Sequence, residues 1–298
     1  MTIEIKLAAE RGQWYDFGMI LTGLIGWPVA HSKSPAMHNA AFAAAGLDGR
    51  YVLLPVAPER IAEAVAGLRA LGFRGANVTV PHKQAVMPFL DDLTPEARAI
   101  GAVNTIVVQK NGALLGTNTD AAGFWQDLRA LGVPLTALRT ENALVLGAGG
   151  SARAVVYALA SHGIPVQVLA RRPEQAAALA ASLAPHLPAT TQLSAHGWTQ
   201  IDQLAPRARL IVNCTPVGMS PHTNAMPWPR DLPFLPQHIV YDLVYNPRQT
   251  MLMAHAATAG ARAHHGLGML VRQGARAWEL WTGQPAPLAI MQAAAERR

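Results

Sequence analysis

Two side chains of this sequence could move a proton on and off a substrate oxygen. Lys83 ends the run NVTVPHK at residues 77–83, and Asp120 ends the run GTNTD at residues 116–120. Burial and neighbouring charges can tune a lysine until it releases a proton, whereas an arginine stays charged at any working pH. Lysine is rare in this chain and arginine is common, so a lysine at position 83 indicates general acid–base chemistry. The alternative interpretation is a surface lysine beside a loop aspartate.

A second motif provides a place for a dinucleotide. Residues 143–146 are typical of a short buried strand, which runs into the turn GAGGSARA at residues 147–154 and an apolar helix through Ala160. Gly147 would make the tight turn, Gly149 would let the backbone approach a pyrophosphate, and Ala152 would allow close packing of the helix. A strand, a glycine turn and a helix in this order predict a dinucleotide site, with the pyrophosphate on the helix N-terminus.

The residues after the next predicted strand, 164–170, indicate which dinucleotide is bound. About 20 residues beyond the glycines, sites specific for NAD usually place an acid that binds the ribose hydroxyls. This chain has Arg171 and Arg172 there instead. Two guanidinium groups suit a 2′-phosphate, so the sequence predicts NADP as the cofactor. A solvated basic start of a helix is the alternative.

Composition limits the class of protein. A chain of 298 residues suits two domains, and 51% hydrophobic with 14% charged residues is typical of a globular enzyme. The net charge of +6 could indicate nucleic acid, but the arginines are scattered and no basic run with interleaved aromatics occurs. We therefore expect no nucleic-acid partner. Cys214 is the only cysteine, which excludes an internal disulfide and a cysteine metal cluster.

Targeting, membrane and metal signals are not expected either. Charged residues interrupt the N-terminus at Glu4, Lys6 and Glu10, and no apolar run reaches the length of a membrane span. We predict a cytoplasmic protein without a membrane partner. The histidines lack metal-ligand spacing with acids, so no metal site is predicted. Residues 1–18 have no assigned role.

Apolar periodicity predicts strands that alternate with helices. Strands are expected at 20–25, 51–55, 76–80 and 239–243, helices at 35–45, 57–71, 120–131, 267–282 and 286–295, a hairpin at 103–117, and a long proline-rich loop at 216–236. This order predicts an α/β fold with two domains. One is an N-terminal, mostly parallel α/β substrate domain of residues 1–120, completed by helices of residues 266–298. The other is a Rossmann-type dinucleotide-binding domain of residues 121–265.

From Thr22 to the C-terminus the chain resembles the shikimate dehydrogenase family, which includes shikimate/quinate dehydrogenases. The resemblance lies in separated segments that follow the family's order: GWPVAHSKSP at 26–35, NVTVPHK at 77–83, GAVNT at 101–105, NTD at 118–120, the Gly147 loop, NCTP at 213–216, YDLVYNP at 241–247 and GLGMLVRQ at 266–273. It implies NADP-linked interconversion of 3-dehydroshikimate and shikimate, a step towards chorismate and the aromatic amino acids.

The resemblance also implies roles for individual residues. Lys83 and Asp120 correspond to the catalytic pair. The substrate carboxylate would be held by Ser32 and Ser34 with Tyr245 nearby, and the ring hydroxyls by Asn77, Thr79, Asn104 and Gln273. The cofactor would be held by Gly147, Ala148, Gly149, Gly150, Ser151, Ala152, Ala170, Arg171, Arg172, Thr215, Val244, Gly266 and Met269. Either serine could instead cap the helix at Pro35, and Asn118 and Thr119 could shape a turn as readily as they contact a ligand.

Two positions depart from the family's usual residues, and the sequence allows more than one function. His82 stands where the family often has an aromatic residue and Trp27 where it often has Asn; we interpret His82 as packing or facing the cofactor. The sequence does not decide which member of the Lys83 and Asp120 pair is the base, nor whether the chain is a monomer or a homodimer. Rival functions are a quinate dehydrogenase with broader substrate use, a methylenetetrahydrofolate dehydrogenase and a non-catalytic regulator with the same fold.

Overall fold

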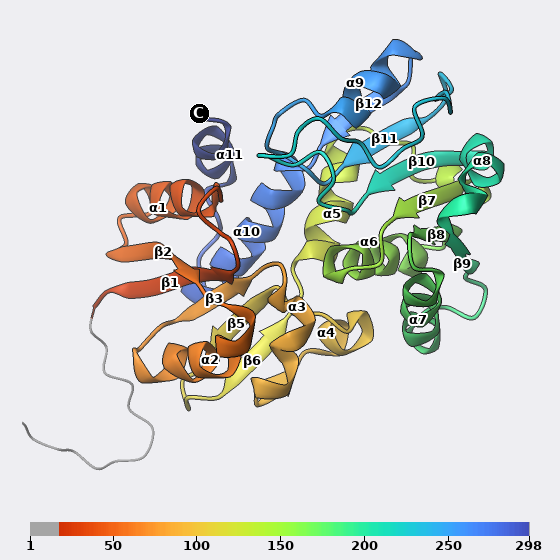
Figure 1. The fold of residues 1–298 in the computed structure, drawn as a ribbon. Helices are drawn as coiled ribbons and strands as arrows, with labels where there is room; N and C mark the ends of the chain where they lie inside the picture. Colours follow the sequence, from red (N-terminus) through yellow and green to blue (C-terminus); the bar gives the residue numbers. More distant parts are fainter. Residues whose placement is uncertain (1–17, 298) are drawn as a thin grey trace, which may run out of the picture.

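The protein is built on two six-stranded sheets that stand side by side (Figure 1). The computed structural model describes residues 18–297. The expectations for the N-terminal segment, that it carries no targeting signal and has no assigned role, lie outside the described residues except at Gly18.

The first sheet has the strand order β2-β1-β3-β5-β6-β4. Its strands are β1 (Ile20–Gly26), β2 (Gly49–Pro55), β3 (Gly75–Val78), β4 (Asp92–Leu93), β5 (Thr105–Val108) and β6 (Leu114–Thr117). β1 is parallel to β2 and β3, whereas β5 is antiparallel to both β3 and β6. The expected hairpin is therefore present, and Gly112 in its turn has a φ of 88°, a conformation that favours glycine.

The second sheet has the order β12-β11-β10-β7-β8-β9 and is parallel throughout. Its strands are β7 (Asn142–Leu146), β8 (Val166–Ala170), β9 (Leu193–Gly197), β10 (Ala208–Asn213), β11 (Ile239–Asp242) and β12 (Arg262–His265). The strand order reverses between β7 and β10, which is the doubly wound arrangement of dinucleotide-binding folds. The predicted α/β fold with a Rossmann-type sheet is thus confirmed.

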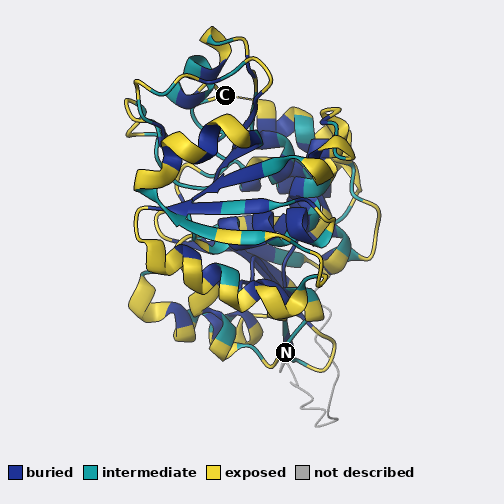
Figure 2. Cartoon of the chain, turned by 90° about the vertical axis from the view of Figure 1, so that its right-hand side faces the viewer, coloured by how far each residue is buried: buried dark blue, intermediate teal, exposed yellow. Residues whose placement is uncertain are grey.

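Helices cover the sheets and carry most of the exposed surface, while the strands between them are largely buried (Figure 2). The helices are α1 (Ser34–Ala44), α2 (Ile61–Ala70), α3 (His82–Ala85), α4 (Pro95–Ile100), α5 (Asp120–Ala130), α6 (Gly150–Ser161), α7 (Pro173–Leu183), α8 (Ile201–Leu204), α9 (Met251–Thr258), α10 (Leu267–Thr282) and α11 (Leu288–Glu296). Among residues 18–297, no helix is both long enough and apolar enough to cross a membrane.

Several elements differ from the expectations. The helix expected at 57–71 opens with a separate 3₁₀ turn, Pro58–Arg60, and the strand expected at 76–80 ends at Val78. The strand ends there because the chain turns: the His82 amide donates to the Thr79 carbonyl at 2.9 Å. Strands β9, β10 and β12 and helices α4, α7 and α9 were not predicted, because short apolar runs do not reveal whether they are strands or buried helices.

Helices α5 and α10 run side by side between the two sheets (Figure 1). α5 leads from β6 of the first sheet to β7 of the second, and α10 returns to pack on the first. The indole of Trp281 on α10 donates to the Ile106 carbonyl of β5 at 3.0 Å. Helix α10 therefore contacts the first sheet at β5.

We expect that Gly123→Ala lowers the free energy of unfolding. A Cβ at Gly123 on α5 would lie 2.7 Å from the backbone nitrogen of Gln273 on α10, so the two helices would have to separate. Overpacking of this kind costs about 1–3 kcal/mol. The control is Gly67→Ala on α2, where a Cβ meets nothing within 4 Å and alanine should stabilise the helix. Urea denaturation of both variants measures the difference, and equal stabilities would contradict the prediction.

Candidate active site

Lys83 and Asp120 are brought together at one edge of the first sheet. Lys83 lies in the short helix α3, just after β3, and Asp120 is the first residue of α5, just after β6. The side-chain oxygen of Asn118 accepts from the backbone amides of Asp120 and Ala121 at 3.0 and 3.3 Å. Asn118 therefore shapes the start of α5, which is the turn role that its residue type allows.

The two side chains form a buried ion pair. Lys83 Nζ lies 2.6 Å from Asp120 Oδ2, and the side chains are 11% and 7% exposed. Lys83 Nζ also donates to Ser151 Oγ at 3.1 Å, across to the first turn of α6. An ammonium has three donors, so among residues 18–297 these two partners leave one donor for a substrate oxygen. The arrangement suits proton transfer at a position next to the glycine loop.

A cluster of amide and hydroxyl groups surrounds Asp120. Asn104 Nδ2 lies 2.8 Å from Asp120 Oδ1, 3.0 Å from Thr119 Oγ1 and 3.1 Å from Gln273 Oε1. Asn104 Oδ1 accepts from the Thr119 backbone amide at 2.7 Å. Asn77 Nδ2 donates to the Asn104 carbonyl at 3.2 Å, so the side-chain amides of β3, of the residue before β5 and of α10 form one connected network.

Tyr51 is a member of this cluster that the sequence did not reveal. Its hydroxyl donates to Asn77 Oδ1 at 2.9 Å and its ring stacks on His38 with centroids 4.3 Å apart. Burial raises the pKa of the Tyr51 hydroxyl, and a hydrogen bond with Ser34 opposes that rise. Tyr51 thus links the candidate residues for the carboxylate to those for the ring. A tyrosine on a strand carried no signal that distinguished it from core.

Two of the candidates for the substrate carboxylate, Ser32 and Ser34, lie at the start of α1, and the third, Tyr245, follows β11. Ser32 Oγ accepts from the Ser34 amide at 3.2 Å, while the N-cap residue of α1 is Lys33 and has no side-chain cap bond. Burial raises the pKa of the Tyr245 hydroxyl, and a hydrogen bond with Ser32 opposes the rise. Thr79 is half-buried just after β3, with its amide bonded to the Ile25 carbonyl of β1 at 2.8 Å.

The glycine loop has the geometry that its motif predicts. Gly147 has a φ of 107°, and a Cβ on it would lie 3.1 Å from the Thr215 side chain. At Gly149 an added Cβ would meet nothing within 4 Å, so the backbone is open to a ligand on that side. Ala152 is fully buried. A Cβ at Gly150 would lie 3.0 Å from Lys83 Cβ, a tight contact that favours glycine where the loop meets α3.

The remaining cofactor candidates follow the ends of strands in the second sheet. Arg171 and Arg172 follow β8 at Ala170 and are exposed, and neither forms an ion pair with another of the residues 18–297. Glu174 stands in the first turn of α7, so an acid is present on this helix. The exposed guanidinium groups fit a 2′-phosphate. Ala148 and Ser151 are half-buried in the loop.

Asp242 holds the turns that carry two of the last four candidates, Thr215 and Val244, while Gly266 is the N-cap residue of α10 and Met269 lies in its first turn. This fully buried carboxylate accepts from Asn213 Nδ2, the Val244 amide and Thr250 Oγ1 at 2.8, 3.0 and 2.6 Å. Burial raises the pKa of Asp242, and these hydrogen bonds oppose the rise. The Thr215 hydroxyl bonds Asn213 Oδ1 at 2.7 Å. The loops after β10 and β11 are therefore fixed to each other.

Further residues and a cavity lie outside the predicted set. His82 is buried with Nε2 2.7 Å from the Val56 carbonyl, which is the packing role, and Trp27 is 49% exposed.

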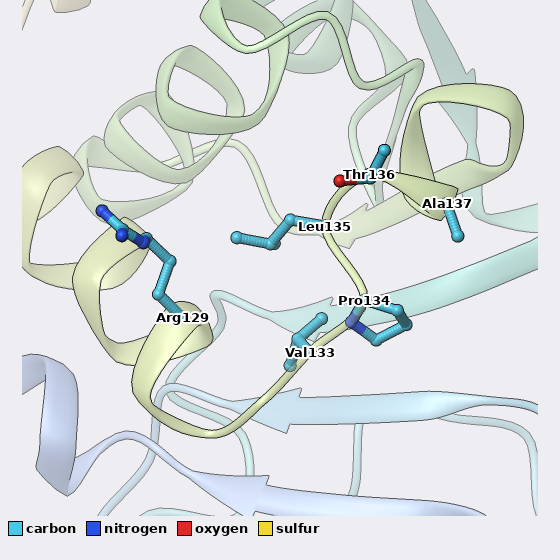
Figure 3. Close-up of a pocket in the computed structure, with 6 residues that line it drawn as sticks. All are labelled: Arg129, Val133, Pro134, Leu135, Thr136 and Ala137. Carbon is cyan, nitrogen blue, oxygen red and sulfur yellow. The ribbon is translucent and has the colours of Figure 1, made fainter.

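A cavity of about 700 Å³ is lined by Arg129, Val133, Pro134, Leu135, Thr136 and Ala137 (Figure 3). It lies at the far end of α5 from Asp120 and contains none of the candidates. Among residues 18–297, no group of three or more His, Cys, Asp or Glu side chains could hold a metal ion.

The chain is similar to known shikimate dehydrogenases in sequence and in fold. Family models match residues 24–106 as a shikimate dehydrogenase substrate binding domain and residues 266–296 as a shikimate 5'-dehydrogenase C-terminal domain. The NADP(+) shikimate dehydrogenase of Salinibacter ruber is 49% identical over 91% of this chain and 95% of its own. The shikimate 5-dehydrogenase of Thermus thermophilus, solved with NADP(H) and shikimate, is 40% identical with a TM-score of 0.82 over 94% and 99% of the two chains.

A quinate dehydrogenase from Corynebacterium glutamicum, solved with NAD, is 31% identical with a TM-score of 0.82 over 93% of this chain and 98% of its own. The fold is thus shared by enzymes with different substrates. A dinucleotide-binding sheet beside a buried lysine–aspartate pair defines a pyridine-nucleotide-dependent oxidoreductase. Within that class, the chain belongs to the shikimate dehydrogenase family.

We expect His38, beneath Tyr51, to make stability depend on pH. It is fully buried, neither ring nitrogen has a hydrogen-bond partner among residues 18–297, and burial lowers its pKa from 6.5 to about 3. The unfolded chain therefore takes up the proton first as the pH falls. The contribution of His38 to stability is present above pH 6.5 and is lost towards pH 3 by about 1.4 kcal/mol per pH unit.

Urea denaturation at several pH values below neutrality measures this slope. His38→Leu, which puts an apolar side chain in the same place, should remove the part of the slope that His38 causes. His222→Leu, at an exposed histidine, should leave the slope unchanged. A slope that persists in His38→Leu would show that other groups cause it.

Proposed function

We propose that this protein is an NADP-dependent shikimate dehydrogenase, which reversibly reduces 3-dehydroshikimate to shikimate in chorismate and aromatic amino-acid biosynthesis. The observation that carries the proposal is the buried pair of Lys83 and Asp120 in contact with the first turn of the dinucleotide helix at Ser151. The names of its relatives support the substrate and the cofactor. A non-catalytic regulator is disfavoured because the pair is intact.

Lys83 donates the proton in the reduction direction. When bound, NADPH supplies a hydride to the C3 carbonyl carbon, and the oxygen gains electron density that must be neutralised. The Lys83 ammonium has a donor available for that oxygen. Asp120 balances its charge, and in the oxidation direction the proton leaves the C3 hydroxyl towards the same pair. Because the pair is coupled through a 2.6 Å contact, the base is assigned to the pair.

The other candidates bind and orient. Ser32, Ser34 and Tyr245 hold the substrate carboxylate, and Asn77, Thr79, Asn104 and Gln273 hold the ring hydroxyls. The open backbone at Gly149 and the N-terminal amides of α6 suit a pyrophosphate, and Arg171 suits the 2′-phosphate. In this proposal residues 1–120 with 266–298 bind the substrate and residues 121–265 bind NADP. A cytoplasmic location and a monomeric or homodimeric state remain predictions from the sequence.

We expect Lys83→Met to lower kcat by roughly 100-fold or more, because the proton donor is lost while the aliphatic stem is kept. Asp120→Asn should be similarly damaging. Lys110→Met, in the β5–β6 turn, is the matched control and should keep the rate of the wild type. Steady-state oxidation of shikimate with NADP, together with NADP affinity by fluorescence titration, measures both effects. A Lys83→Met enzyme with normal kcat and raised KM would limit Lys83 to substrate binding.

We expect Arg171→Ala to weaken NADP binding while NAD binding stays almost unchanged. A hydrogen bond to a charged group contributes about 1.5–3 kcal/mol, which corresponds to about one to two decades of affinity. Arg172→Ala is the neighbouring control and should have the smaller effect. The measurement is kcat/KM for NADP and NAD, with shikimate and with quinate. Equal kcat/KM values of the wild type for both cofactors would move the assignment towards the quinate enzymes.

A further inference from the structure

Arg153, in the first turns of α6, is a buried cation without a carboxylate partner. It is 9% exposed, and none of the carboxylates within residues 18–297 forms an ion pair with it. Burial lowers the pKa of its guanidinium, which nevertheless stays charged. Buried charges are normally paired because desolvation is costly. A cation kept here without an acid has to be explained by the groups that it does contact.

The guanidinium contacts two different helices. Arg153 Nε donates to the Ile100 carbonyl at 2.5 Å, and Nη2 donates to Ser182 Oγ on α7 at 2.5 Å. Ile100 is the last residue of α4, where a helix carbonyl has no partner within the helix. Gly101 follows with a φ of 67°, and a Cβ on it would lie 2.6 Å from Arg153 Nη2. The guanidinium therefore rests directly on the Ile100–Gly101 backbone.

The residues that follow Gly101 contact the backbone of Lys83 and the side chain of Asp120. The Val103 amide donates to the Lys83 carbonyl at 2.7 Å, and the Asn104 side chain donates to Asp120 Oδ1 at 2.8 Å. Arg153 lies two residues along α6 from Ser151, whose hydroxyl accepts from Lys83 Nζ. Arg153 also bonds the Ile100 carbonyl, three residues before Val103, whose amide bonds the Lys83 carbonyl. The first turn of α6 therefore makes two separate contacts with the first domain's site residues, one at Lys83 and one at Ile100.

We propose that Arg153 is a positioning residue that fixes residues 100–104, and through them Lys83 and Asp120, relative to the cofactor-binding turn of α6. The inference rests on the proposed function, because hydride transfer requires a fixed distance between the cofactor and the Lys83 and Asp120 pair. Reacting atoms must approach to about 3–3.5 Å, and a displacement of about 1 Å can cost 100-fold in rate. The cofactor is held by α6 and the acid–base pair by the first sheet, so a link between them sets that distance.

The test compares Arg153→Met with Ser182→Ala. Methionine keeps an apolar stem and removes the buried charge, so the fold should be retained, but the Ile100 carbonyl loses its donor. Ser182→Ala removes the contact of Arg153 with α7 and keeps the contact with Ile100. We expect Arg153→Met to lower kcat by roughly 10-fold to 100-fold with KM for shikimate and Kd for NADP within about threefold, and Ser182→Ala to stay within about twofold. Arg153→Lys, with one flexible donor, should be intermediate.

Hydrogen–deuterium exchange of the peptide that contains residues 100–104 provides a readout that does not depend on activity. Exchange should be faster in Arg153→Met than in the wild type and unchanged in Ser182→Ala. Unchanged kcat and exchange in Arg153→Met would overturn the proposal, and so would a parallel loss of NADP affinity, which would assign Arg153 to the cofactor loop. A wild type that does not oxidise shikimate would refute the proposed function, while exchange would still decide whether Arg153 holds the segment.

Discussion

The buried ion pair between Lys83 and Asp120 is the interaction on which the rest of the site depends. Removing one partner of such a pair leaves an uncompensated buried charge, which is strongly destabilising, so both residues must be fixed together. Asp120 is the first residue of α5, where the helix N-terminus favours a negative charge, and Asn104 donates to its second oxygen. Lys83 receives a second acceptor from Ser151. The pair is therefore held by three elements that are distant in sequence.

A constraint of sheet topology explains how these elements meet. In parallel sheets the ligand site forms beyond the carboxyl ends of the strands. Lys83 follows β3 and Asp120 follows β6, while the glycine loop follows β7. Asn104 precedes β5, but β5 is antiparallel to β3, so its amino end lies at the same edge. Helices α5 and α10 place this edge beside the corresponding edge of the second sheet.

Prediction from the sequence succeeded where one local segment contains the physical reason. The turn at Gly147, the strand before it and the helix after it are contiguous, and the predicted helix over 267–282 matches α10 residue for residue. Tyr51 and Arg153 were missed because their partners are far along the chain: Tyr51 bonds Asn77 across 26 positions, and the Arg153 contact spans 53 positions to Ile100. Asp242 was missed although Val244 and Thr250 are near in sequence, because only the folded turn brings their donors onto one carboxylate. An arginine in an apolar helix or a tyrosine in a strand has the same local pattern whether it faces solvent, core or site.

The hydrogen-bond inventory of the cluster indicates how a substrate would be selected. The Asn104 amide has two N–H donors, yet Thr119, Asp120 and Gln273 all offer acceptors within 3.1 Å, so one acceptor must share or lose its donor. Gln273 Nε2 meanwhile bonds the Leu270 carbonyl of its own helix at 2.7 Å and can exchange that partner at little cost. Gln273 is therefore the side chain with most freedom to turn towards a ring hydroxyl, whereas Asn104 and Asn77 are fixed. A ligand hydroxyl that donates to Gln273 Oε1 would relieve the shared Asn104 donor, and a ligand without that hydroxyl would leave the acceptor poorly satisfied. Such differences in satisfied polar groups allow a site to reject close analogues.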